Sequence, residues 1–178
     1  MASYKVGQKG FPSNNLLNIN AMIEEKDSRD SSRRIFKDVI YLEFIKGKKN
    51  NNRHSGYDMA NKIVVKFTSY ELRVFIYALK SLILTGASEY KKYSDPNLAS
   101  TNGNPKEITL GKQANFDKYF INIEEIENDK FGIGFNLFEL KAFIDSLKII
   151  ADETDFTMYK YQRVVHQQIN KSGSTNEN

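Results

Sequence analysis

The sequence lacks cysteine and tryptophan, and it has only two histidines and three prolines among its 178 residues. Without cysteine the chain can form no disulfide and can use no thiolate as a metal ligand or nucleophile. No apolar run approaches the roughly 20 residues of a membrane-spanning helix, and the N-terminus MASYKVGQKG lacks the apolar core of a signal peptide. We therefore expect a cytoplasmic protein with no membrane partner.

The residues also offer little for catalysis. His54 and His166 stand far apart, and neither has a companion at a metal-ligand spacing such as His-x-x-x-His. The GIG at 132–134 is too short for a phosphate-binding loop, and paired acids such as Glu124 and Glu125 are typical of surface charge. We expect that the protein is not an enzyme and that it holds no metal and no cofactor. A carboxylate-only metal site, as in some nucleases, would leave only a weak trace in a sequence.

What the chain does contain is an internal repeat. Residues 62–72 read KIVVKFTSYEL, and residues 130–140 read KFGIGFNLFEL. Each copy begins with the two-residue alternation of a half-buried strand and continues with apolar residues three and four apart, which is the period of a helix face. At the junction, Thr68 and Asn136 each stand three residues before a glutamate, which is the pattern of a capping box. Each copy therefore predicts a strand that runs directly into a capped helix.

Further alternating segments precede each copy. The first is preceded by 16–24 and 34–46, and the second by 88–94, 106–112 and 118–127. The segments between them have the composition of loops. This grouping predicts an α+β fold with two antiparallel four-stranded sheets, each followed by its own helix, in a β4-α-β4-α pseudo-repeat.

The length fits one domain. We expect it to cover residues 1–152, with repeat halves at about 15–86 and 87–152. Residues 153–170 would form a C-terminal extension, either a further helix or an extra strand, and residues 171–178 a flexible tail.

A helix on one face of each sheet leaves the opposite face for solvent, a partner or a ligand. In the strand predicted at 34–46 the even-numbered residues make the better core face, which turns Arg33, Lys37, Tyr41 and Glu43 outward. Cations interleaved with rings on a sheet suit single-stranded nucleic acid, because Lys and Arg neutralise phosphates while rings stack on bases.

Two basic clusters add to this outward face. One is the loop predicted at 46–56, KGKKNNNRHSG, and the other is YKKY at 90–93. Each cluster alone would be typical of a solvated basic surface, and their convergence on one surface favours binding. The predicted nucleic-acid-binding residues are Arg33, Lys37, Tyr41, Lys46, Lys48, Lys49, Arg53, Lys62, Lys66, Lys91, Lys92 and Lys130.

The first predicted helix is apolar on two sides. Besides its core face it carries Tyr70, Val74, Tyr77 and Ala78 on the other side. A helix that is apolar on two sides is usually buried on two sides. We therefore expect a subunit interface and a homo-oligomer.

Four segments in order resemble the Whirly single-stranded-DNA-binding proteins: DVIYLEFIKG, YDMANKIVVKFTSYELRVFI, SEYKKYSDPN and FGIGFNLFELKAFIDSL. The likeness covers roughly residues 15–152, and it extends to the positive-cofactor-four coactivators, whose repeat unit the Whirly fold duplicates. The resemblance implies single-stranded DNA on the sheets and helices that meet at the centre of a tetramer. The family's lysine-glycine-lysine-alanine run is matched only by Lys9-Gly10, which stands before Pro12 instead of leading into a strand, so its role is not transferred.

The resemblance leaves the nucleic acid and the origin partly open. Guide-RNA-binding proteins of kinetoplastids share the fold, so RNA remains an alternative ligand. No transit peptide like that of the plant members is visible, which favours a bacterial, phage or mobile-element origin without excluding an organelle.

The leading hypothesis is a weakly sequence-selective single-stranded-DNA-binding protein, without catalytic activity, that acts in replication, recombination, repair or DNA transfer. One alternative is an RNA-binding protein of the same fold. The other is an oligomeric structural or protein-interaction module, which the modest net charge of +4 and the outward Glu43, Glu124 and Glu127 favour, because they would repel phosphates.

Overall fold

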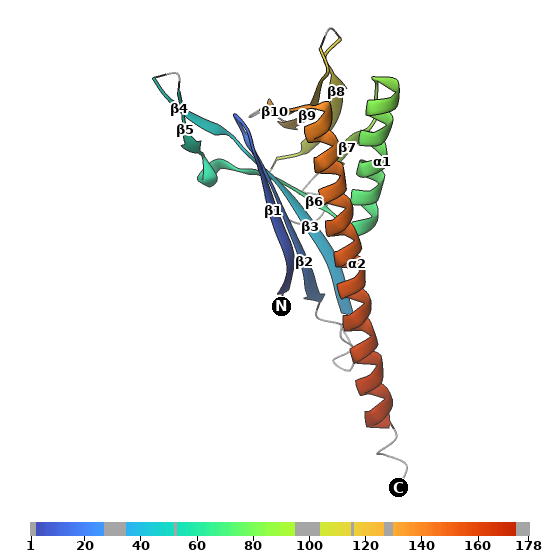
Figure 1. The fold of residues 1–178 in the computed structure, drawn as a ribbon. Helices are drawn as coiled ribbons and strands as arrows, with labels where there is room; N and C mark the ends of the chain where they lie inside the picture. Colours follow the sequence, from blue (N-terminus) through green and yellow to red (C-terminus); the bar gives the residue numbers. More distant parts are fainter. Residues whose placement is uncertain are drawn as a thin grey trace.

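A computed structural model of the chain describes residues 3–26, 35–51, 53–94, 104–114, 116–126 and 130–173. The first sheet has the order β1 (Ser3–Pro12), β2 (Leu16–Lys26), β3 (Ile35–Ile45) and β6 (Ile63–Phe67). The second has the order β10 (Lys130–Asn136), β9 (Lys118–Glu125), β8 (Lys106–Lys112) and β7 (Lys91–Ser94). Between β3 and β6 lie a separate hairpin, β4 (Gly47–Asn50) and β5 (Arg53–Tyr57), and a 3-10 turn at Met59–Asn61. Helix α1 (Ser69–Thr85) follows the first sheet and helix α2 (Leu137–Gly173) the second, which confirms the predicted fold class (Figure 1).

The predicted alternation separates the two faces of the first sheet. Leu42 on β3 lies between Ile19 on β2 and Val65 on β6, and all three side chains are buried. The second sheet has an equivalent row in Leu110 and Ile121. These rows and the inner faces of both helices belong to one continuous hydrophobic core.

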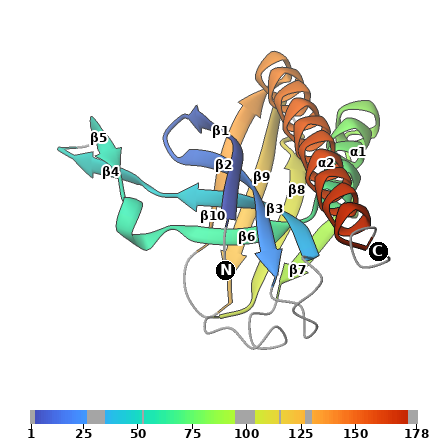
Figure 2. The ribbon, with the colours of Figure 1, turned by 90° about the horizontal axis from the view of Figure 1, so that it is seen from below.

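The helices do not each cover their own sheet. Helix α1 contacts β3 and β6 of the first sheet and also β8 of the second. Helix α2 contacts β9 and β10, and it also packs along β1, β2 and β3. Figure 2 shows the two helices side by side on one side of the molecule, with the β4–β5 hairpin pointing away from them. The two halves of the repeat therefore fold as one unit.

Both predicted capping boxes are present. The backbone N–H of Glu71 donates to Thr68 Oγ1 at 3.2 Å, and the backbone N–H of Thr68 donates to Glu71 Oε2 at 2.8 Å. At α2 the backbone N–H of Glu139 donates to Asn136 Oδ1 at 2.9 Å, and the backbone N–H of Asn136 donates to Glu139 Oε2 at 2.8 Å. These bonds satisfy backbone donors that the first helical turn would otherwise leave without partners, so each strand passes into its helix without a loop.

The first sheet begins earlier than predicted. Strand β1 pairs with β2 from Ser3 to Pro12, whereas the sequence placed the start of this half near residue 15. Lys9 and Gly10 therefore do lie within a strand, contrary to the prediction. Glycine and proline weaken the strand signal of this segment, and pairing with β2, together with a bulge between Lys5 and Gly7, holds it in the sheet.

Two other segments are more regular than the sequence indicated. The stretch predicted as a loop at 46–56 forms most of the β4–β5 hairpin. Residues 153–170 continue α2. The ring of Tyr161 packs against those of Tyr4 and Phe36, with 4.9 and 5.3 Å between the ring centres. Of the predicted tail at 171–178, residues 171–173 end α2 and the remainder lies outside the described residues. Within the described part of the chain, no helix is long and apolar enough to cross a membrane.

Candidate nucleic-acid interface

The outer face of the first sheet carries the predicted group of lysines and a tyrosine. The strand register places Tyr41 between Asn20 and Lys66, and alternation puts Lys37 and Lys62 on the same face. Lys66 Nζ lies 5.6 Å from the centre of the Tyr41 ring. These side chains share one face of the first sheet, although Val39 and Glu43 on the same face of β3 are buried.

The same face also carries carboxylates that neutralise these lysines. Glu24 Oε1 accepts a hydrogen bond from the Tyr41 hydroxyl at 2.6 Å, and Lys66 Nζ lies 3.3 Å from Glu24 Oε2. Lys62 forms an ion pair with Glu43, whose other oxygen accepts a hydrogen bond from Asn18 Nδ2 at 2.6 Å. The charge available for phosphates on this sheet is therefore smaller than the number of lysines suggests.

The Glu24–Tyr41 contact shifts the pKa of both groups. Burial and then the hydrogen bond to the Glu24 carboxylate raise the pKa of Tyr41 to about 12. Burial alone would raise the pKa of Glu24, but the Tyr41 hydrogen bond and the charges of Lys66 and Lys37 bring it below its ordinary value. Tyr41 is thus a neutral ring held in place by a carboxylate.

Glu24→Gln is expected to lower the free energy of unfolding near pH 7, because a charge-assisted contact is lost. A depressed carboxyl pKa contributes stability that is present above the unfolded value of about 4.3 and is lost as the pH falls through the folded value. The difference from the unmodified protein should therefore shrink in acid. Urea unfolding at pH 7 and pH 3 measures it, with Glu89→Gln at an exposed position as the control. A difference that does not depend on pH would contradict the assignment.

The outer face of the second sheet holds further binding groups that were not predicted. On β9, Lys118, Phe120 and Asn122 alternate with the core side chains of Tyr119 and Ile121. Phe120 lies across Gly134 of β10, where an added Cβ would come within 3.1 Å of the ring. Glycine at this position thus leaves room for the ring to lie flat on the sheet. The alternation argument used for 34–46 would have found these residues in KYFINIEEIE.

A polar groove of about 670 Å³ runs beside Phe120. We call it the amide groove, because side-chain amides provide much of its lining. Its walls are the β1–β2 turn and the outer surface of β9 and β10, and Asn15 Nδ2 joins them by donating to the Gly132 carbonyl at 2.9 Å. The residues that supply its polar and aromatic groups are Ser13, Asn14, Asn15, Gln113, Lys118, Phe120, Phe135, Asn136 and Glu139. This combination offers hydrogen bonds to base edges, a ring for stacking and a cation for a phosphate.

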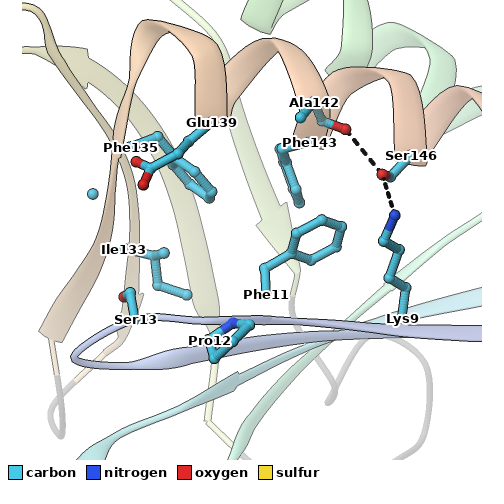
Figure 3. Close-up of a pocket in the computed structure, with 11 residues that line it drawn as sticks. Lys9, Phe11, Pro12, Ser13, Ile133, Phe135, Glu139, Ala142, Phe143 and Ser146 are labelled. Carbon is cyan, nitrogen blue, oxygen red and sulfur yellow. Dashed lines mark hydrogen bonds between the residues drawn. The ribbon is translucent and has the colours of Figure 1, made fainter.

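A smaller apolar cavity of about 240 Å³ adjoins the groove between β1 and α2 (Figure 3). Phe11 projects from β1 and meets the ring of Phe143 edge-on at 4.8 Å. Lys9 closes one end, because its Nζ donates to Ser146 Oγ at 2.8 Å and Ser146 donates in turn to the Ala142 carbonyl at 2.9 Å. The hydrogen bond of Lys9 and the ring contact of Phe11 therefore hold the edge strand β1 against α2.

The lysines predicted from YKKY have different surroundings. Lys91 is exposed, and it pairs with Glu107 at 3.3 Å on the outer face. Lys92 does not face a ligand: its side chain is only 13% exposed, its Nζ lies 2.6 Å from Glu71, and it sits over the Phe67 ring at 4.6 Å. The register of β7 on β8 turns it toward α1, so its role is structural.

The other predicted residues fall into three groups. Lys130 is exposed at the edge of the second sheet and pairs with Glu124 at 2.6 Å. Arg33 lies outside the described residues, as does the predicted repulsive Glu127. The basic residues Lys46, Lys48, Lys49 and Arg53 lie on or next to the β4–β5 hairpin, where all four are exposed.

Among the described residues, no group of three or more His, Asp or Glu side chains is placed to hold a metal ion. The paired acids Asp152 and Glu153 lie on α2, where Asp152 forms an ion pair with Arg73 of α1 at 2.9 Å. That contact joins the two helices.

Solved structures similar to this chain share its fold. One is WHY1 from Arabidopsis thaliana, with a TM-score of 0.58 at 12% identity over 86% of both chains. Another is the plant transcriptional regulator PBF-2, with a TM-score of 0.57 at 14% identity over 93% of this chain and 95% of that one. WHY3 from Arabidopsis thaliana gives a TM-score of 0.57 at 9% identity over the same shares. No family model and no curated protein sequence matches the chain.

These likenesses confirm a Whirly-type fold, which the sequence segments predicted. At such low identity they describe the fold alone. The similar structures come from plants and give no support to the bacterial, phage or mobile-element origin predicted from the sequence.

Proposed function

We propose that this protein binds single-stranded DNA without catalytic activity and with weak sequence selectivity. The observation that carries the proposal is the amide groove, where Phe120, Lys118 and several amides converge on the outer face of the second sheet. The Whirly-type fold supports it. We further propose that the protein protects or organises unpaired strands in replication, recombination, repair or DNA transfer.

In the proposed mechanism, stacking contributes more than charge. Lys62, Lys66, Lys91 and Lys130 each have a carboxylate partner, so a phosphate must compete with that partner. The rings of Phe120 and Tyr41 can stack on any base, which explains weak selectivity. The amides in the groove then orient the unstacked bases through their exposed edges.

Anisotropy titrations with labelled dT, rU and duplex oligomers at two salt concentrations test the proposal. We expect dT to bind more tightly than duplex, with an affinity that falls by about 0.7 log units per log unit of salt for each phosphate contacted. Because the chain has no tryptophan, its emission comes from tyrosine, and stacking of a base on Tyr41 should quench part of it. Equal or tighter binding of duplex would contradict the proposal, and tighter binding of rU would favour the RNA alternative.

The exposed side of the helix pair supports an oligomer. Tyr70 is 74% exposed, Tyr77 68% and Ile149 62%, although all are large apolar or aromatic side chains. Such a surface is unusual for a monomer in water. We propose that it contacts a second copy of the chain, with a tetramer as the assembly that the Whirly resemblance implies.

Tyr77→Glu is expected to reduce the oligomer to smaller species, because it places a charge in a desolvated contact. Light scattering at micromolar concentration measures the mass, with Gln162→Glu at an exposed polar position of α2 as the control. A strict monomer for the unmodified protein would contradict the oligomer. A stable oligomer with no affinity for any nucleic acid would favour the protein-interaction alternative.

A further inference from the structure

The β4–β5 hairpin is an arm that belongs to neither large sheet. We use the term arm for residues 46–57. It projects from the body of the molecule on the side away from the helices (Figures 1 and 2). The described side chains from Lys48 to Ser55 are all exposed, so packing does not explain why this segment is present.

The base of the arm is fixed to the amide groove. The backbone N–H of Gly47 donates to Asn15 Oδ1 at 2.9 Å, and the Tyr57 hydroxyl donates to the Ser13 carbonyl at 2.9 Å. Asn15 and Ser13 also line the groove. A strand that leaves the groove at the β1–β2 turn therefore arrives at the base of the arm.

The arm carries a concentration of positive charge. Its sequence KGKKNNNRHSGY contains four cationic residues and no acid. Asp58 at its base lies 3.5 Å from Lys48, whereas Lys49 and Arg53 have no carboxylate partner among the described residues. On the sheets, by contrast, lysines such as Lys66 and Lys130 are paired with carboxylates. The arm is thus suited to attract phosphates.

The cations of the arm point to opposite sides of the ribbon. Beyond the irregularity between Lys48 and Lys49, Lys49 pairs with His54 in one row of the ribbon. Arg53 pairs with Asn50 in the next row, and consecutive rows face opposite ways, so Lys49 and Arg53 lie on different faces. A ribbon with cations on both faces can contact two phosphate backbones at once, one on each side, whereas a single strand would use only one face.

We propose that the arm binds duplex DNA next to the single strand held in the amide groove, so that the protein recognises junctions between single-stranded and duplex DNA. The major groove of B-DNA admits a two-stranded ribbon and presents phosphates on both sides. The tip offers Asn50 and Asn51, whose amides can contact base edges, and it has no ring on which an unpaired base could stack. His54, the ring nearest the tip, packs on Tyr57 at 4.8 Å. This inference rests on the proposed function, because the groove must hold the single strand.

Anisotropy titrations compare a dT oligomer, a blunt duplex, and a duplex with a dT tail of the same length as the free oligomer. The unmodified protein should bind the tailed duplex about tenfold more tightly than dT, since the arm adds phosphate contacts. The double variant Lys49→Ser/Arg53→Ser should lose most of this advantage and keep its dT affinity. Its salt slope on the tailed duplex should fall by about 0.9 for each contact removed.

The outcomes separate the two proposals. If the unmodified protein binds dT but gains nothing from the duplex, the role of the arm is overturned and the proposed function stands. The same conclusion follows if the double variant loses affinity equally on dT and on the tailed duplex. If dT itself does not bind, the proposed function fails first.

Cross-linking gives a direct readout, because the chain has no natural cysteine. A photoactivatable group on Asn50→Cys should label the duplex part of the tailed substrate, and the same group on Gln162→Cys on α2 should not. Labelling confined to the dT tail would overturn the proposal. Circular dichroism checks that each variant keeps its fold.

Discussion

Phe143→Ala should lower the free energy of unfolding by about 3–5 kcal/mol, the usual loss for a phenylalanine removed from a core. Phe143 is fully buried on α2. Its ring meets Phe11 of β1 at 4.8 Å and Phe135 of β10 at 5.1 Å (Figure 3). Loss of this ring removes contacts that join the two sheets through α2, so the surrounding elements cannot easily close the cavity.

Urea unfolding followed by far-UV circular dichroism measures the effect. Phe138→Ala is the matched control, since Phe138 lies on the same helix but is 79% exposed. We expect the control to change stability by no more than about 0.5 kcal/mol under conditions where the chain is monomeric. A loss below about 1 kcal/mol for Phe143→Ala would show that the site is not a core position.

Phe120→Leu should weaken binding of oligo-dT by about tenfold, because a base stacked on an aromatic ring contributes about 1–3 kcal/mol. The ring is placed for stacking, since it is partly exposed and lies across Gly134 beside the amide groove. Leucine keeps an apolar side chain of similar length but removes the flat surface. The loss should appear equally at low and high salt, since it is not electrostatic.

Phe120→Tyr is the conservative counterpart and should bind dT almost as the unmodified protein does. Anisotropy titrations of the three proteins at two salt concentrations give the comparison. If leucine and tyrosine weaken binding alike, or if neither changes it, the single strand does not stack on Phe120. The groove would then lose its role as the centre of the interface.

Much of the local structure could be predicted because its signals lie close together in the chain. The alternation in 34–46 identified Ile40, Leu42 and Phe44 as core residues, and all three are buried. The capping boxes at Thr68 and Asn136 need only residues three positions apart, and both are formed. A side chain's face in a strand and a helix start are local properties, so the sequence is enough to predict them.

The features that the sequence predicted wrongly depend on contacts between residues far apart in the chain. Strand β1 has glycine and proline in unfavourable positions, and only its pairing with β2 makes it a strand. The segment 46–56 has the composition of a loop, and it becomes a ribbon because Gly47–Asn50 pairs with Arg53–Tyr57. Lys92 was predicted to bind nucleic acid, but the register of β7 on β8 directs its side chain toward Glu71.

By itself the sequence determined the two-part repeat, the inner faces of the strands and the helix starts. These follow from periodicity and from side-chain chemistry within a few residues. Only the tertiary structure decided which lysines have a carboxylate partner, because Glu43 reaches Lys62 from the neighbouring strand and Glu24 of β2 reaches Lys66 of β6 across β3. It also decided where the amide groove lies, since the groove exists only where the β1–β2 turn meets β10, and strand pairing across the chain fixes that meeting point.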